Sequence, residues 1–272
     1  MTETSRETPV LSRREGAVQV LTLNRPERLN AWTQGLEEMY FGLLAAAEKD
    51  PGVRAIVVTG AGRGFCAGAD MELLTSIDPA EADATEQFDR AYPYRIAKPL
   101  IAAVNGAAAG LGLVQALYCD LRFTTPEAKW TTAFARRGLV AEYGISWLLP
   151  RLVGQGAALD LLLSGRVVTG TEAVALGLAN RVVPAEDLQA EALAYAQMVA
   201  ESCSPWSMAV MKAQVREDLH LDFAAADAKS QRLMLESFRQ GDVKEGVASY
   251  VEGRLPDFEP LGSATATQRG SE

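Results

Sequence analysis

The chain has 272 residues, of which 48% are hydrophobic and 22% charged, and its formal net charge is −9. This composition is typical of a soluble globular protein that is long enough for one large domain, or for one domain with a helical appendage. The acidic balance, without a basic stripe, argues against nucleic acid as a partner, and no apolar run is long enough to cross a membrane.

The three cysteines, Cys66, Cys119 and Cys203, are widely spaced and odd in number. They form neither a disulfide framework nor a zinc-binding spacing, and they fit a reducing compartment. The first residues of the chain carry no apolar segment, so no secretory signal is expected. We therefore expect a cytoplasmic protein.

Strands and helices alternate in the first half of the chain. Strands are expected at 8–14, 17–23, 53–59, 99–104, 119–124 and 128–130, and helices at 32–49, 86–96 and 109–118. The polar, acidic segment 76–87 is expected to be a mobile surface element. The alternation predicts a stacked α/β core.

From residue 157 onward the apolar spacing is mostly helical. Helices are expected at 156–163, 171–176, 187–203, 206–218, 222–239 and 242–253, with one strand at 180–183. The last residues are small and polar, which predicts a disordered tail. The chain thus combines an α/β core with a helical C-terminal region.

Two glycine-rich stretches, 60–70 and 105–112, each follow an apolar run and lead into a helical pattern. A strand, glycine loop and helix in this order present backbone N–H groups at the helix start, and two such units can converge on one negatively charged oxygen. That arrangement is an oxyanion hole, and it predicts carbonyl or thioester chemistry. The alternative is that these glycines serve only tight turns and close packing.

Five segments, in order, resemble those of the crotonase superfamily, also called the enoyl-CoA hydratase/isomerase family: 23–31 (LNRPERLNA), 65–70 (FCAGAD), 103–112 (AVNGAAAGLG), 163–183 and 250–258. The resemblance implies an α/β fold, a crotonase-like spiral of ββα units with a helical C-terminal trimerisation region. It divides the chain into a flexible N-terminus at 1–7, a spiral core that holds the CoA-thioester site at 8–200, a helical oligomerisation region at 201–260 and a disordered tail at 261–272.

The resemblance also implies a partner and an assembly. The substrate is an acyl-CoA thioester, coenzyme A being part of that substrate, with no separate cofactor and no metal. The assembly is a homotrimer or a hexamer. The family's two oxyanion-hole N–H groups fall on Ala69 and Leu111, where they would polarise the thioester carbonyl and stabilise an enolate.

The coenzyme A contacts implied by the resemblance fall on Arg28, Ala31, Ala67, Asp70 and Met71. Arg28 resembles a position that contacts phosphates, and the stretch from Ala67 to Met71 resembles one that binds adenine. Each has a simpler interpretation as well. Asp70 is well placed to be a helix N-cap, and the alternative for Arg28 is a solvated surface residue.

The sequence departs from a typical hydratase at its two catalytic positions. A hydratase of this family positions and splits one water with two glutamates, and Val114 and Phe134 stand at those positions here. Neither side chain can transfer a proton, so the two-glutamate mechanism is not available in its usual form. We expect Val114, Phe134 and Trp147 to line the acyl pocket, although Phe134 and Trp147 would serve equally well as core residues.

One carboxylate remains as a candidate base, that of Glu142, which is expected at the start of a helix. Several branches of the family keep a single working carboxylate at this position, and a double-bond isomerase needs only one base. Its apolar neighbours are expected to raise the pKa of Glu142. The alternative is a first-turn glutamate that only complements the helix dipole.

Other candidates for chemistry are poor. His220 is the only histidine, so no Ser-His-Asp set is available, and Cys66 has no evident base beside it. The sequence therefore predicts an enoyl-CoA enzyme that isomerises a double bond, or adds water to it, through one carboxylate. The alternatives are a non-catalytic acyl-CoA-binding protein and a CoA-thioester hydrolase, while a dinucleotide-binding oxidoreductase leaves the second glycine stretch unexplained.

Overall fold

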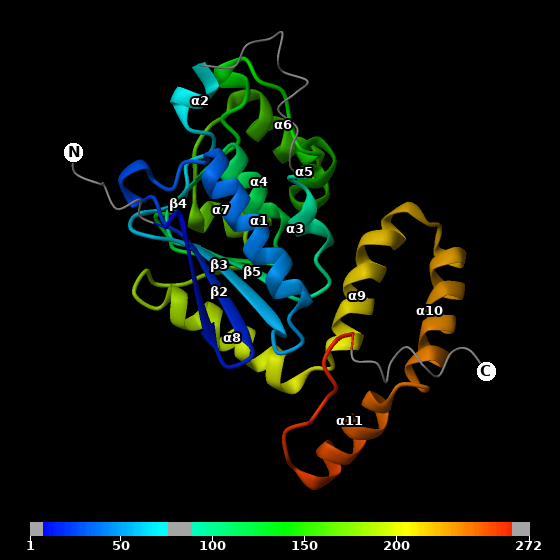
Figure 1. Ribbon diagram of the computed structural model, residues 1–272. Coiled ribbons are helices and arrows are strands. Elements are labelled where there is room, and N and C mark those ends of the chain that lie inside the picture. Colours follow the sequence, from blue (N-terminus) through cyan, green and yellow to red (C-terminus); the bar gives the residue numbers. More distant parts are fainter. Residues whose placement is uncertain (1–7, 76–88, 263–272) are drawn as a thin grey trace.

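The computed structural model describes residues 8–75 and 89–262 (Figure 1). The predicted flexible N-terminus, the acidic segment 76–87 and the tail from residue 263 onward lie outside these residues. The fold is mixed α/β, as predicted. No helix of the described ranges is both long enough and apolar enough to cross a membrane.

The main sheet has six strands in the order β1-β2-β3-β5-β7-β10. Their bounds are β1 Val10–Glu15, β2 Val18–Leu23, β3 Ala55–Gly60, β5 Leu100–Val104, β7 Leu121–Thr124 and β10 Arg181–Val182. The first two strands form an antiparallel hairpin, and every other neighbouring pair is parallel. All residues of β3 and β5 are buried, which matches their unbroken apolar runs because a central parallel strand is covered on both faces.

A second sheet of four short strands carries the glycine-rich stretches. Its order is β4-β6-β8-β9, with β4 Gly64–Cys66, β6 Ala107–Ala109, β8 Lys129–Thr131 and β9 Val168–Thr169. Sequence analysis predicted loops where β4 and β6 lie, because runs of Gly and Ala carry no strand pattern. The two stretches in fact pair with each other as parallel strands, which fixes their relative position.

Helices cover both faces of the main sheet (Figure 1). On one face, α1 (Gln34–Lys49) and α4 (Leu111–Tyr118) build the larger apolar cluster, and every residue of α4 is buried. On the other face, α8 (Leu188–Ser202) packs Leu188, Ala192, Ala196 and Ala200 against β2, β3 and β5. The side chain of Thr33 caps α1 by accepting a hydrogen bond from the Leu36 N–H at 3.3 Å.

The other helices are α2 Met71–Thr75, α3 Tyr92–Arg95, α5 Ile145–Val153, α6 Gln155–Ser164, α7 Gly170–Leu176, α9 Pro205–Glu217, α10 Phe223–Ser237 and α11 Gly241–Glu252. Most match the predicted ranges within a few residues. Two differ. The described part of the predicted helix 86–96 holds only α3, whose first two residues include a proline, and α5 begins three residues after Glu142 instead of at it.

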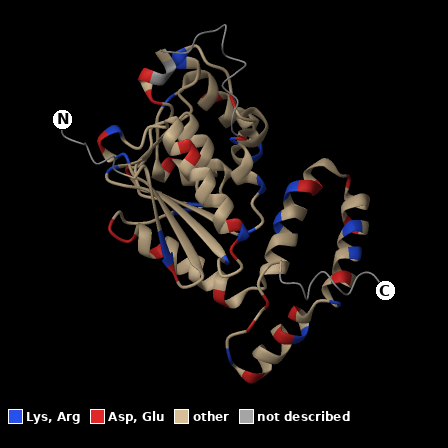
Figure 2. Cartoon of the chain, viewed as in Figure 1, with Lys and Arg blue, Asp and Glu red and all other residues tan. Residues whose placement is uncertain are grey.

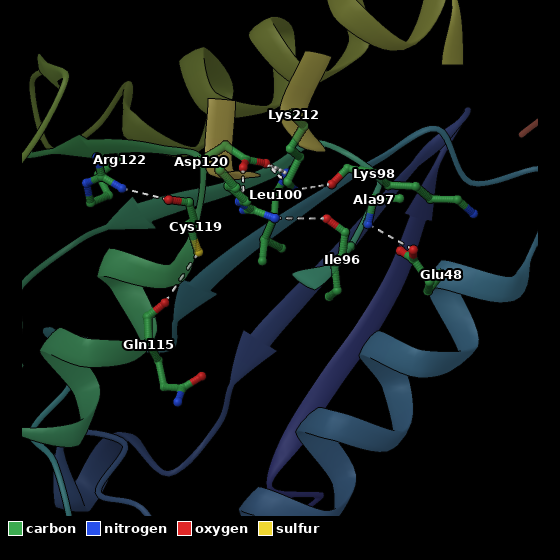
Figure 3. A network of polar contacts seen from close by, with 11 residues as sticks. Glu48, Ile96, Ala97, Lys98, Leu100, Gln115, Cys119, Asp120, Arg122 and Lys212 are labelled. Atoms are coloured by element: carbon green, nitrogen blue, oxygen red, sulfur yellow. Dashed lines mark hydrogen bonds and ion pairs between the residues drawn. The ribbon is translucent and has the colours of Figure 1, made fainter. Parts of the chain in front are cut away.

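The C-terminal helices α9–α11 extend away from the sheet (Figure 1), with charges of both signs interspersed along them (Figure 2). Helix α9 is anchored to the core by partly buried charges. Lys212 donates to Asp120 at 2.5 Å and to the Lys98 carbonyl at 2.7 Å, and Arg216 pairs with Asp120 at 2.9 Å. Figure 3 shows Asp120 accepting from Lys212 and from the Leu100 N–H, at the start of β5.

Candidate active site

The two glycine loops meet directly. Gly68 and Gly110 have positive φ angles of +92° and +48°, which glycine adopts at little cost. A Cβ atom on Gly68 would lie 2.7 Å from the Ala109 carbonyl oxygen, and one on Gly112 would collide with the Cys66 carbonyl. The glycines therefore allow both a turn and a close approach between the loops, as the interpretation of tight turns and close packing expected.

The amide N–H groups of Ala69 and Leu111 are both left without a protein acceptor among the described residues. At Ala69 the chain bridges to Trp32: the Trp32 N–H donates to the Gly68 carbonyl at 2.7 Å, and the Asp70 N–H donates to the Trp32 carbonyl at 3.0 Å. Leu111 is the first residue of α4, where no intrahelical acceptor exists. Both residues line one cavity, so two free donors are available there.

The first glycine loop is tied to the preceding turn by Asn30. This side chain is fully buried, and its residue has a positive φ of +58°. Its amide nitrogen donates to the carbonyls of Ala61 and Gly64 at 3.0 and 2.7 Å, and its oxygen accepts from the Arg25 N–H at 2.8 Å. These bonds hold the 25–31 turn, which carries Arg28 and Ala31, against the glycine loop.

A cavity of about 480 Å³ opens where these segments meet. Nine of the eleven predicted site residues line it: Arg28, Ala31, Ala67, Ala69, Asp70, Met71, Leu111, Phe134 and Glu142. The structure adds lining residues that sequence analysis did not assign to the site, namely Gly68, Glu72, Gly110, Thr132, Ala133, Arg137 and Leu139, and it places Tyr143 there as well. The predicted residues from four separate segments are thus brought together.

Val114 and Trp147 are the two predicted pocket residues that do not line this cavity. Val114 is 1% exposed within the fully buried helix α4. Trp147 stacks on His220 with ring centroids 5.6 Å apart, and Arg151 lies 3.9 Å above the same ring. The face of α5 that carries Trp147 is therefore turned toward the C-terminal helices.

Glu142 lies in the turn before α5, and not in its first turn as predicted. Its carbonyl accepts the Ile145 N–H at 3.1 Å, and its side chain is half-buried. Burial raises the pKa of Glu142, and the positive charge of Arg90 acts in the opposite direction without cancelling that rise. A carboxylate with a raised pKa is better matched to proton transfer near neutral pH than an exposed one.

Beside Glu142 lies a polar network that sequence analysis missed. The Arg90 guanidinium donates to both oxygens of the buried Glu37 carboxylate, at 2.8 and 3.0 Å, and to the Tyr143 hydroxyl at 2.7 Å. Trp32 donates its ring N–H to the same carboxylate at 2.7 Å. These residues are far apart in the sequence, and nothing in their local patterns indicates that they meet.

Charged residues surround the mouth of the cavity. Arg28 is exposed and pairs with Glu72 at 3.4 Å, and Arg137 is exposed as well. Asp70 is different: burial alone would raise its pKa, but hydrogen bonds from the Glu72 N–H and from Arg25 outweigh that effect and hold the pKa low. Its bond to the Glu72 N–H is the interaction of a helix cap, as the simpler interpretation of Asp70 expected.

The surroundings of Cys66 and His220 argue against both as catalytic residues. Cys66 is fully buried, and burial raises the pKa of its thiol to about 12, so a thiolate nucleophile is not available there. His220 lies in the stack on Trp147, away from the cavity. Within residues 8–75 and 89–262, no group of three His, Cys, Asp or Glu side chains is placed to hold a metal ion.

Comparison with known proteins gives consistent matches over nearly the whole chain. Residues 13–260 match the enoyl-CoA hydratase/isomerase family. The chain is 34% identical over 263 residues to a 1,2-epoxyphenylacetyl-CoA isomerase of Escherichia coli, covering 92% of this chain and 97% of that protein. It is 39% identical over 259 residues to a putative enoyl-CoA hydratase of Thermus thermophilus, covering 90% and 98%.

A solved structure shows the same architecture. The crystal structure of a probable enoyl-CoA hydratase/isomerase from Mycobacterium abscessus matches with a TM-score of 0.85 and 31% sequence identity. The match covers 92% of this chain and 98% of that one. The mixed α/β fold described above is therefore the fold of these proteins.

Proposed function

The chain belongs to the enoyl-CoA hydratase/isomerase family, and from this we propose that it is an acyl-CoA enzyme that moves the double bond of an enoyl-CoA, with Glu142 as its base. One observation carries the proposal. The half-buried carboxylate of Glu142, which accepts no hydrogen bond from the described residues, lines the same cavity as the free amide N–H groups of Ala69 and Leu111.

The proposed reaction needs only these groups. The Glu142 carboxylate removes a proton from C2 of a 3-enoyl-CoA, and the electrons of the broken C–H bond shift into the thioester carbonyl to give a dienolate. The amides of Ala69 and Leu111 stabilise the dienolate oxygen, each contributing on the order of 3 kcal/mol. Glu142 then returns the proton to C4, which leaves the conjugated 2-enoyl-CoA, and no water or redox equivalent is consumed.

Besides Glu142, the carboxylates that line the described part of the cavity are Asp70 and Glu72, and the surroundings of both favour isomerisation over hydration. Addition of water by the two-glutamate route requires a second proton-transfer group, and Phe134 occupies one of the two positions while Val114 occupies the other. Asp70 is hydrogen-bonded to Arg25, and Glu72 is exposed at the mouth beside Arg28. The Escherichia coli relative is named as the isomerase of an epoxide, 1,2-epoxyphenylacetyl-CoA, which supports isomerisation as a reaction type without specifying the movement of a double bond, and the Thermus relative is named as a putative enoyl-CoA hydratase.

Arg28, Ala31, Ala67, Asp70 and Met71 are proposed to hold the coenzyme A part of the substrate. They line the cavity from the 25–31 turn and from the segment that leads into α2. The exposed guanidinium groups of Arg28 and Arg137 supply positive charge for phosphate at the mouth. The proposal leaves Val114 and Trp147 in the protein interior and assigns the acyl group to Phe134 and its neighbours Ala133 and Leu139.

The proposal includes a cytoplasmic homotrimer or hexamer. Phe223, Tyr250 and Val251 on the C-terminal helices are 86%, 87% and 78% exposed in the single chain. Large apolar side chains that are exposed on helices projecting from the core are typical of surfaces that another subunit covers. Light scattering after size exclusion measures the mass, and a monomer at micromolar concentration would contradict this part of the proposal.

The test of the chemistry is turnover of a 3-enoyl-CoA in D2O by the wild type, Glu142→Gln and the matched control Glu38→Gln. Glu38 is an exposed carboxylate on α1, away from the cavity. We expect a conjugated 2-enoyl thioester from the wild type and the control, and a loss of about 10²- to 10⁴-fold in Glu142→Gln.

The other outcomes separate the alternatives. A 3-hydroxyacyl-CoA, detected by mass spectrometry, would show a hydratase and require a second proton donor. Release of free CoA would show a thioester hydrolase. Tight binding of the thioester without turnover by the wild type would show a binding protein, and activity retained in Glu142→Gln would remove Glu142 from the mechanism.

A further inference from the structure

The residue that follows Glu142 is held in an unusual backbone conformation from two sides. Tyr143 has a φ of +53°, in the left-handed region that L-residues other than Asn and Asp rarely adopt. Its carbonyl oxygen accepts a hydrogen bond from the Tyr118 hydroxyl of α4, and its own hydroxyl accepts one from Arg90 at 2.7 Å. Such a conformation persists only where its surroundings enforce it, so these two contacts set the direction in which the turn presents Glu142.

Arg90 is itself fixed in place by α1. Its guanidinium forms a bidentate ion pair with Glu37, whose side chain is 3% exposed. The Glu37 carboxylate also accepts a hydrogen bond from the ring N–H of Trp32. A planar guanidinium that donates two N–H groups to one carboxylate has little freedom to move. The same group lies 5.3 Å from the centre of the Tyr143 ring. Arg90 thus links the position of the Tyr143 turn to the buried side chain of Glu37 in the first turn of α1.

Arg90 also provides the charge that acts on Glu142. Burial of the Glu142 carboxylate raises its pKa, and Arg90 is the charged group that lowers it. Among the residues that the structure describes, the other charged groups around the cavity are Arg28 and Glu72, which pair with each other, Asp70, which pairs with Arg25, and Arg137, which is exposed on the turn after Phe134. The neighbouring phenol of Tyr143 is neutral, because burial raises its pKa above the ordinary value.

We propose that Arg90 is a positioning residue for the Glu142 carboxylate: anchored to Glu37 and Trp32, it fixes the Tyr143 turn and supplies the positive charge that faces the base. The inference rests on the proposed function, in which Glu142 must be ionised to remove a proton. Without Arg90, desolvation acts on the carboxylate unopposed, and a larger share of it is protonated at a given pH. With Arg90, the carboxylate stays in a water-poor site and still returns to its ionised form after each turnover.

The test compares Arg90→Met, Arg90→Lys, Glu37→Gln and the matched control Glu38→Gln. Two quantities are measured: the acid limb of the kcat/KM profile against pH, and the titration of the Glu142 carboxyl carbon by 13C NMR, assigned through Glu142→Gln. In Arg90→Met both midpoints are expected to rise by about one pH unit, because the opposing positive charge is gone. Arg90→Lys keeps the charge and is expected to keep the midpoints while kcat falls.

Glu37→Gln gives a shift of opposite sign. It removes the negative charge that compensates Arg90, so the net positive charge near Glu142 increases and both midpoints are expected to fall. Glu38→Gln is expected to move neither midpoint. A residue that served only to hold the fold would lower the rate without moving the midpoints, and it would not give shifts of opposite sign in Arg90→Met and Glu37→Gln.

The proposal is overturned if Arg90→Met folds, as judged by circular dichroism and cooperative unfolding, and the Glu142 carboxyl titrates where it does in the wild type. If Arg90→Met does not fold, Glu37→Gln decides the matter: a downward shift relative to Glu38→Gln supports the proposal, and an unchanged midpoint overturns it. Activity retained in Glu142→Gln would instead overturn the proposed function, and the NMR titration would still decide whether Arg90 acts on Glu142.

Discussion

Gly112, in the first turn of α4, packs against the carbonyl group of Cys66, at the end of β4, with no room for a Cβ atom between them. This contact joins the two segments that carry the free amide groups. Gly112→Ala forces the segments apart, and we expect it to destabilise the protein by about 1 to 3 kcal/mol, the usual cost of inserting atoms into a packed core. Denaturant unfolding measures the change, and kcat is expected to fall with it because the two amides no longer converge.

The matched control for this prediction is Gly42→Ala in α1. A Cβ atom on Gly42 meets nothing within 4 Å, and the position is exposed. This change is expected to stabilise the protein by about 1 kcal/mol through helix propensity alone. If Gly112→Ala is as stable as the wild type, the two loops are not interlocked as described.

Asn30→Ala is expected to cost about 3 kcal/mol in the free energy of unfolding. It removes three side-chain hydrogen bonds and leaves partly buried backbone groups at Arg25 and Ala61 without that partner. Alanine also tolerates the positive φ of this position less well than asparagine does. Asn24→Ala, which removes one exposed side-chain hydrogen bond, is the control and should stay within about 1 kcal/mol of the wild type.

Arg28→Ala is expected to raise the KM for an enoyl-CoA about tenfold and to leave kcat nearly unchanged. Arg28 is exposed at the mouth of the cavity, where one charge-assisted hydrogen bond to a phosphate is worth about 1.5 kcal/mol. Salt should weaken binding of free CoA to the wild type more than to the variant, because screening acts on the charge that was removed. Arg13→Ala, on the exposed strand β1, is the control, and an equal effect from both variants would contradict a local contact.

Glu142→Gln is expected to be more thermally stable than the wild type at pH 8, with the difference shrinking toward pH 4. The folded pKa of Glu142 is raised by burial, so folding opposes its ionisation, and the wild type loses this stability as the pH rises through the folded pKa. Glutamine is never ionised and avoids the loss. Melting temperatures measured across this range check the sign, and a difference that is constant with pH would contradict the raised pKa.

Asp120→Asn is expected to loosen helix α9 from the core at a cost of about 2 to 3 kcal/mol. Asp120 pairs with Lys212 and Arg216, whose side chains are only 10% and 17% exposed, so removal of the acid leaves two largely buried cations without it. Limited proteolysis near α9 should accelerate. Asp160→Asn, which breaks an exposed pair with Arg166, is the control and is expected to cost less than about 1 kcal/mol.

Local patterns were sufficient to predict most of the fold. The apolar runs of β3 and β5, and the stop of α1 at the turn beginning at Asp50, are visible in short windows of sequence. The strands β4 and β6 were missed because their pairing partners lie about 40 residues apart and their glycines and alanines favour no single local structure. The start of α5 was misplaced because Gly144 caps it after the left-handed Tyr143, a backbone state that no simple pattern reports.

The candidate site, like the fold, could be predicted from the sequence only in part. Backbone donors after glycine loops have a recognisable sequence pattern, and Ala69 and Leu111 lie together at the cavity. Arg90 and Glu37 could not be paired in advance, since 53 residues separate them and each, taken alone, has the pattern of a surface charge. Trp147 was wrongly assigned to the pocket because the sequence does not show which side of its helix faces the cavity. The stacking of Trp147 on His220 in the structure shows that it faces the C-terminal helices instead.

Within residues 8–75 and 89–262, the cavity lining lies between Arg28 and Tyr143, so the last hundred of these residues add no wall to it. The C-terminal helices and the reacting groups are therefore free to change independently over evolutionary time. Substitutions on α10 and α11 leave the lining of the cavity unchanged, whereas a single exchange at Phe134 alters it directly.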